Sequence, residues 1–181
     1  MSAPAAKTTE RRAGPERHGG TVAADLGALL TELEVAFREV AETALARPDV
    51  AVEGHGDEPE QGQQGAYLAL VAPAGALQIG IASDEAGCQA LAKGLMGMGE
   101  ADPALSPPEM ADAFCEIVNI VAGGFKGRIR EKVGSLTMGL PVFFHGPAQP
   151  TEHTAVRVAR LRAGGVAVAL LLVFPRAHAE G

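Results

Sequence analysis

The 181-residue chain lacks tryptophan, has one tyrosine and contains only two cysteines. Two cysteines are too few for a disulfide framework, and Cys88 and Cys115 lack the spacing of metal ligands. The N-terminus has no apolar core of a signal peptide, and no apolar run reaches the ~18 residues of a membrane-spanning helix. With so few aromatic side chains, we expect a mainly aliphatic core. These absences favour a protein of the reducing cytoplasm.

Positive charge is also scarce, because fifteen basic residues face twenty-two acidic ones and give a net charge of −7. Such a balance argues against a nucleic-acid partner and against an anionic membrane surface. The five histidines are scattered through tail-like and loop-like segments and form no set of metal ligands. The sequence also has no Ser/His/Asp order, phosphate-binding glycine loop or dinucleotide fingerprint.

The length of the chain predicts one domain with short tails. Residues 1–21 are rich in Ala, Pro, Gly and charge without apolar periodicity, which predicts a disordered tail. The domain is expected over residues 22–176, followed by a C-terminal tail at 177–181. It opens with a helical apolar pattern from Val22, which Pro48 is expected to close.

Strand-like and helical segments then alternate. Residues 54–65 are polar and rich in glycine, so a loop is expected there between the strand runs on either side. The strand runs are a possible short one at 49–53, then 66–71 and 77–82 as a hairpin, and finally 135–144, 154–161 and 165–174. Two helices are expected between the two sets of strands, one from about Ser83 to Met96 and one from Pro107 to about Lys132. The order predicts an α+β domain in which two α-β-β-β units form an antiparallel sheet with helices on one face.

The helix expected over 107–132 carries the residues that suggest chemistry. Its apolar stripe (Met110, Phe114, Ile117, Val121 and Phe125) falls on one side at ~100° per residue. Glu116 and Asn119 fall on the opposite side and are neighbours three positions apart. Gly123-Gly124 costs roughly 2 kcal/mol of helix propensity relative to alanine. This cost indicates close approach by another backbone, a local kink or helix–helix packing.

The segment from about Val35 to Phe174 resembles the CheX-like chemotaxis phosphatases, which are relatives of CheC. The main support is the helix sequence Asp112-Ala-Phe-Cys-Glu116-Ile-Val-Asn119-Ile-Val-Ala-Gly123-Gly-Phe-Lys126. Further support comes from Leu136-Thr-Met-Gly-Leu-Pro141-Val downstream and from Leu95-Met-Gly97 upstream. The repeated α-β-β-β organisation of that family agrees with the order of elements expected here.

The resemblance implies an activity and a partner. Members of the family hydrolyse the phospho-aspartate of a response-regulator receiver domain such as CheY. By position, Asn119 would orient the attacking water, and Glu116 would dock the receiver by pairing with one of its lysines. The Mg²⁺ ion would belong to the receiver, so no cofactor of the chain's own is implied.

The number of sites and the presence of catalysis are the two points on which the resemblance leaves alternatives open. CheC-type relatives carry a second Glu-x-x-Asn on the first helix, where this chain has Glu39-Val-Ala-Glu42. The chain is therefore expected to have one site, with a structural first helix. A non-catalytic CheX-like module that binds receivers or other signalling proteins would use the same helix face, and a flagellar-switch-type structural subunit is a third possibility.

We also expect a homodimer joined partly through its sheets, because the runs 136–144 and 165–174 are apolar.

Overall fold

The computed structural model describes residues 26–72, 75–146 and 151–176. The tails expected at 1–21 and 177–181, and the first four residues of the expected domain, lie outside these ranges. The elements in chain order are α1 (Leu26–Thr43), β1 (Val50–Gly56), β2 (Gln64–Ala72), β3 (Gly75–Ser83), α2 (Glu85–Leu95), α3 (Pro107–Val133), β4 (Thr137–Met138), β5 (Val142–His145), β6 (Thr154–Ala163) and β7 (Val166–Pro175).

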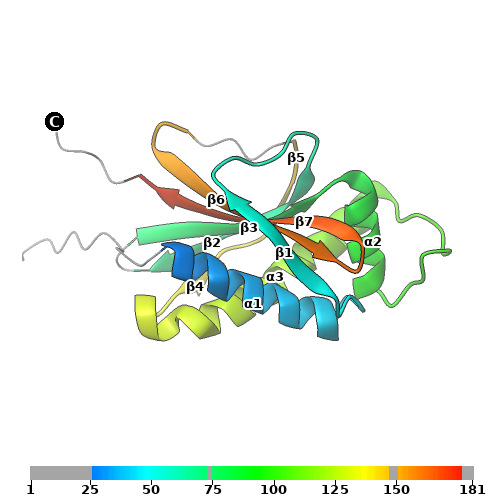
Figure 1. Ribbon diagram of the computed structural model, residues 1–181, viewed down its shortest axis with the longest axis horizontal. Coiled ribbons are helices and arrows are strands. Elements are labelled where there is room, and N and C mark those ends of the chain that lie inside the picture. Colours follow the sequence, from blue (N-terminus) through cyan, green and yellow to red (C-terminus); the bar gives the residue numbers. More distant parts are fainter. Residues whose placement is uncertain (1–25, 73–74, 147–150, 177–181) are drawn as a thin grey trace, which may run out of the picture.

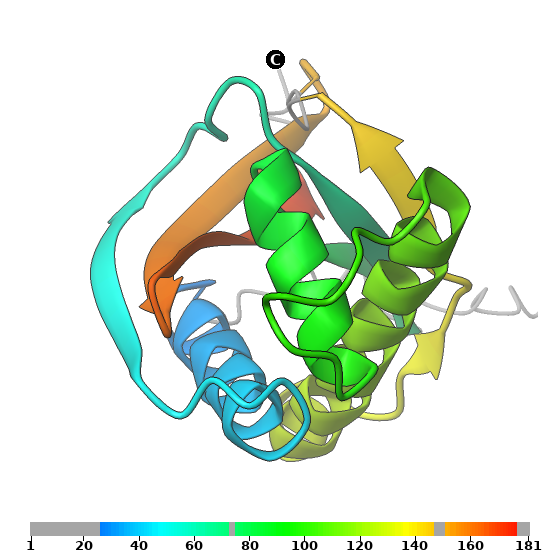
Figure 2. The ribbon, with the colours of Figure 1, turned by 90° about the vertical axis from the view of Figure 1, so that its right-hand side faces the viewer.

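The seven strands form one antiparallel sheet in the order β1-β6-β7-β3-β2-β4, with β5 also paired to β2. The three helices lie side by side, and the sheet curves around them (Figures 1 and 2). This arrangement confirms the predicted α+β fold. None of the three helices of the described chain combines the length and the hydropathy needed to cross a membrane.

The helices cover one face of the sheet, as predicted. The larger apolar cluster contains the buried side chains of all three helices and the inward strand residues, such as Phe37, Phe114 and Leu170. A smaller cluster around Val158 and Leu171 contains strand residues alone and lies on the opposite face. Alternation along β7 explains the division, because successive side chains of a strand point to opposite faces.

Three expected segments differ from the structure. The first helix ends at Thr43 rather than at Pro48, and Ala46 then adopts a left-handed conformation with φ 53°. Strand β1 continues to Gly56, into the segment expected to be a loop. The single strand expected at 135–144 is interrupted by Gly139-Leu140-Pro141, although β4 and β5 both pair with β2. Proline at 141 has no N–H to give to the ladder, which favours an interruption there.

Strand β7 lies between β6 and β3, so both of its edges are paired. We expected the 165–174 run to be covered by a second subunit. That expectation is wrong for the edges of the strand, which are paired within the sheet, and the buried side chains of the strand are also covered within the chain. The Gly164-Gly165 turn joins β6 and β7 in a tight hairpin, in which both glycines have positive φ.

Candidate functional site

Glu116 and Asn119 lie on the outward face of α3, as the helical periodicity predicts. Glu116 is exposed and Asn119 is half-buried, whereas Phe114, Ile117 and Val121 are fully buried beneath them. The side-chain amide Nδ2 of Asn119 donates to Oε2 of Glu116 across 3.4 Å. The two candidate residues therefore form one accessible pair.

The helix that carries the pair is held firmly at its N-terminus. The carboxylate of Glu109 accepts from the backbone N–H of Ser106 at 2.9 Å and from its hydroxyl at 2.6 Å. These hydrogen bonds lower the pKa of Glu109, because they stabilise its charged form. Ser106 and Glu109 thus form a capping box, which fixes the helix two turns before Glu116.

The residues next to the Glu116–Asn119 pair are an exposed carboxylate, a half-buried thiol and a partly exposed isoleucine. Asp112 is exposed one turn earlier, and the half-buried Cys115 has a thiol pKa raised by burial and by the charge of Asp112. Ile120 retains 37% of its surface exposed, although its aliphatic neighbours on α3 are buried. The sequence analysis missed Ile120, because an isoleucine inside an apolar helix pattern gives no sign of exposure. The available sequence signal for its exposure was the pair of glycines, Gly123 and Gly124, that follow it by three and four residues.

The glycines of α3 leave the outward face uncovered. A Cβ atom added to Gly123 or Gly127 would have no described atom within 4 Å, whereas one at Gly124 would lie 3.7 Å from Cβ of Ala36 on α1. Helix–helix packing within the chain therefore does not explain Gly123 or Gly127. The helix also runs unbroken through them from Pro107 to Val133.

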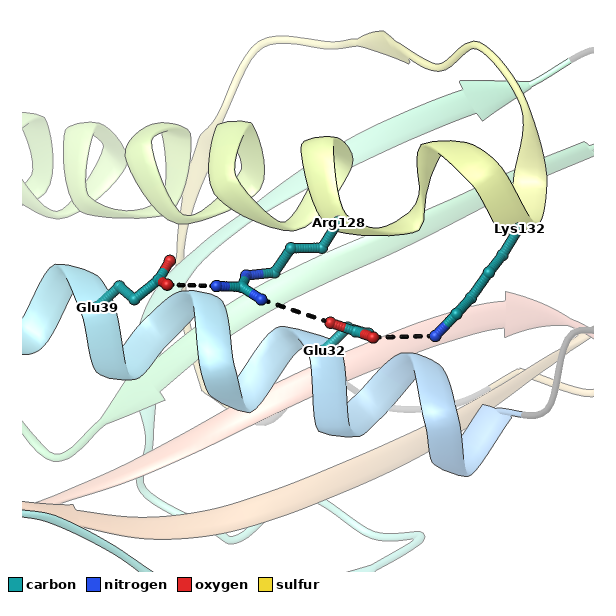
Figure 3. A network of polar contacts seen from close by, with 4 residues as sticks. All are labelled: Glu32, Glu39, Arg128 and Lys132. Atoms are coloured by element: carbon teal, nitrogen blue, oxygen red, sulfur yellow. Dashed lines mark hydrogen bonds and ion pairs between the residues drawn. The ribbon is translucent and has the colours of Figure 1, made fainter.

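The first helix is joined to α3 by ion pairs. Glu39 pairs with Arg128, whose guanidinium also lies 3.7 Å from Glu32, and Lys132 donates to Glu32 at 2.9 Å (Figure 3). The hydrogen bond from Lys132 is the main reason why the pKa of Glu32 lies below its usual value. We call Glu32, Glu39, Arg128 and Lys132 the inter-helix ion-pair network. It gives Glu39 a partner within the chain, as a structural α1 requires.

A hollow of about 460 Å³ lies between the end of α1 and α2, and neither Glu116 nor Asn119 lines it. Lys93 in its wall donates to the carbonyl of Asp102 at 2.6 Å. Gln89 exchanges two hydrogen bonds with the backbone of Leu105, at 2.9 and 3.0 Å. These polar groups thus hold the segment between α2 and α3.

The Glu116–Asn119 pair is suited to holding a water molecule and a cationic group of a partner in position. A neutral amide both donates and accepts hydrogen bonds, so it can hold a water molecule beside an anion without adding negative charge. A carboxylate next to it attracts a cationic group of a partner. Because both side chains stand on an open helix face, the reacting group would have to be brought by another macromolecule.

Comparison with known proteins agrees with this geometry. The family model for chemotaxis phosphatase CheX matches residues 67–159, just over half of the chain, including Glu116 and Asn119. No curated protein matches the chain. Three similar solved structures are those of CheX from Desulfovibrio desulfuricans, CheX from Vibrio vulnificus, and a CheX–CheY–BeF₃–Mg²⁺ complex from Borrelia burgdorferi.

Their identities to this chain are low, but the folds agree. The Desulfovibrio protein is 12% identical with a TM-score of 0.70, covering 82% of this chain and 99% of that one. The Vibrio protein is 18% identical with a TM-score of 0.66, covering 80% and 97%. The Borrelia protein is 16% identical with a TM-score of 0.64, covering 82% and 98%. By its match to the family model over more than half of its length, the chain belongs to the CheX family.

Proposed function

We propose that the protein hydrolyses the phospho-aspartate of a CheY-like receiver domain, with Asn119 positioning the water and Glu116 docking the receiver. The observation that carries this proposal is the accessible Glu116–Asn119 pair on a rigid helix, inside the segment that matches the chemotaxis phosphatase family. The Borrelia relative of this fold has been solved with CheY, BeF₃ and Mg²⁺. That complex supports a receiver as the partner.

The reaction needs little from this chain beyond positioning. The water oxygen attacks phosphorus, the bond between phosphorus and the aspartate oxygen breaks, and the products are the aspartate carboxylate and inorganic phosphate. An acyl phosphate is already labile, so holding water in line provides most of the acceleration. Mg²⁺ would be supplied by the receiver, and its charge would stabilise the phosphoryl oxygens.

Glu116 has a different part in the proposal. Its carboxylate would pair with a receiver lysine and so fix the position of α3 over the phosphorylated site. Asn119 lies one helical turn away, so a receiver held by Glu116 places its phosphoryl group near the amide. We place this reaction in the cytoplasm.

The test is the release of phosphate from a panel of phosphorylated receiver domains, with the protein, without it, and with the Asn119→Ala variant. We expect at least one receiver to lose phosphate faster with the wild type and much less so with the variant. A receiver that binds the protein but keeps its normal lifetime would favour the non-catalytic binding module. Persistence of full stimulation in Asn119→Ala would exclude the assigned mechanism.

We also propose a homodimer that uses the β2, β4 and β5 end of the sheet. Tyr67 and Val71 of β2 are 36% and 49% exposed, and nearby Leu140 and Val142 are 87% and 47% exposed. Contiguous apolar side chains of this kind favour association. Light scattering at micromolar concentration should show a dimer, and Leu140→Glu should shift it toward the monomer. A monomeric wild type would contradict this proposal.

A further inference from the structure

The outward face of α3 beyond Asn119 carries two exposed glycines, Gly123 and Gly127, beside the longer side chains of Lys126 and Arg130. Gly123 lies about 6 Å further along the helix axis, at 1.5 Å per residue, and Gly127 about 6 Å beyond it. Both are exposed, and open space surrounds the position of a Cβ atom at each. Ile120 is the exposed apolar residue one turn before Gly123 and Gly124.

The fold does not require glycine at these two positions. A Cβ at Gly65 or Gly94 would collide with backbone oxygens, at 2.0 Å from Ile81 and 2.5 Å from Leu45. Gly123 and Gly127 have no such neighbour in the described chain, and alanine is the better helix former. Glycine here therefore lowers helix propensity without relieving any contact within the chain.

The packing of α1 keeps this surface open. Arg128 and Lys132 reach from α3 to the carboxylates of Glu39 and Glu32 along one flank of the helix (Figure 3). Gly124 faces the same flank, where its nearest contact is Ala36. The first helix is thus fixed beside Gly124 and does not cover Gly123.

A receiver would approach the open surface closely. Its phosphorylated site lies at the carboxyl ends of the parallel strands, among the loops that follow them, as in other doubly wound α/β domains. For the amide of Asn119 to reach water at that site, α3 must enter between these loops. One helical turn beyond Asn119, a loop backbone would meet Gly123, where the missing side chain leaves room for it.

We propose that Gly123 and Ile120 determine receiver docking: a receiver loop beside the phospho-aspartate packs its backbone against Gly123 and an apolar side chain against Ile120. This inference rests on the proposed function, since the receiver is the partner in both. Helix side chains lean toward the N-terminus, so Ile120 stands next to Glu116 while Gly123 leaves its other side free. The charged and apolar docking contacts thus adjoin the residue that positions water.

The test compares two adjacent glycines. Gly123→Ala should raise KM for the phosphorylated receiver about tenfold, and Gly123→Gln should raise it further, because each added atom occupies the space of the loop. Gly124→Ala is the matched control, since a Cβ there would lie 3.7 Å from Cβ of Ala36 on α1, whereas a Cβ at Gly123 meets open space. It should leave KM unchanged. Both alanine variants should raise the thermal unfolding midpoint, which separates docking from stability.

The docking role of Ile120 is tested by replacing its apolar side chain with a polar one and with another apolar one. Ile120→Gln should raise KM several-fold, and Ile120→Leu should restore docking because it keeps the apolar surface. Wild-type KM in Gly123→Gln and Ile120→Gln would overturn the inference and leave the proposed function intact. A receiver that binds without turnover, but more weakly to Gly123→Gln, would reject the proposed function and support the docking surface. No binding and no turnover with any receiver would reject both.

Discussion

Asn119 and Glu116 contact each other through a hydrogen bond of 3.4 Å, which is longer than the usual range for such bonds. A bond of this length is weak and easily exchanged. In a complex with a receiver, a lysine would therefore displace the amide from the carboxylate at little cost. The Asn119 amide would then be free to bind water, which links docking to water positioning.

Replacing Asn119 by alanine should reduce the turnover number for receiver dephosphorylation by about 10²-fold, the range typical for loss of one positioning group. The fold should remain intact, because the side chain lies on the outward face and alanine favours helix. Phosphate release measured at saturating receiver, together with circular dichroism, checks both expectations. Lys126→Ala is the control, since that cation on the same helix has no assigned role, and an equal loss there would contradict the assignment.

Replacing Glu116 by glutamine should act mainly on KM, because it removes a charge that attracts the receiver lysine. We expect an increase of about tenfold at low ionic strength, which becomes smaller as salt screens the wild-type pair. Initial rates across receiver and salt concentrations measure this effect. An increase in KM that does not change with salt would show that Glu116 does not dock a cation.

The inter-helix ion-pair network should give stability that depends on pH. The pKa of Glu32 is lowered in the folded state, chiefly by its hydrogen bond from Lys132. A lowered folded pKa means that stability is present above the unfolded value of about 4.3 and is lost as pH falls through the folded value. Glu32→Gln should therefore lower the unfolding midpoint at pH 7, and its difference from wild type should disappear toward pH 3.

Glu131→Gln is the control for that measurement, because Glu131 is an exposed carboxylate of α3 without an ion pair among the described residues. Its unfolding midpoint should follow the wild type at every pH. If the difference for Glu32→Gln stayed constant from pH 7 to pH 3, the ion pair with Lys132 would not explain it.

Local sequence signals predicted α3 and the outward position of Glu116 and Asn119 well. Ser106, Glu109 and Gly134 mark the helix ends through hydrogen bonds and backbone geometry within a few residues, and periodicity separates Glu116 from Ile117. Ile120 was not predicted as exposed, because the apolar pattern around it is typical of buried residues and only the two glycines that follow it are a signal. Nor was the central place of β7 predicted, since the order of strands is set by contacts far apart in sequence.

The length of strand β1 is another feature that the sequence alone could not predict. Most of its side chains are exposed because it is an edge strand, so no apolar alternation extends to Gly56. What extends the strand is its pairing with β6, including a register shift between Val52 and Gly54. Such pairing is a property of the folded sheet and has no local signal in the polar sequence that follows Val52.

The sheet register can be tested at Gly65, which pairs with Ala82 of β3 and Phe144 of β5. A Cβ at this position would lie 2.0 Å from the carbonyl oxygen of Ile81 and 2.8 Å from Cα of Ala82, both backbone atoms. Because a backbone flanked by two paired strands cannot move aside, Gly65→Ala should lose roughly 3 kcal/mol of unfolding free energy. Denaturant unfolding measures this loss.

Gly54→Ala is the matched control for that variant, because Gly54 is also a strand glycine and an added Cβ there meets nothing within 4 Å. Its unfolding free energy should stay within about 0.5 kcal/mol of wild type. Equal stability of Gly65→Ala and wild type would show that β2 and β3 do not pair in this register. Since β2 also carries β4 and β5, that result would displace the whole edge on which the proposed dimer depends.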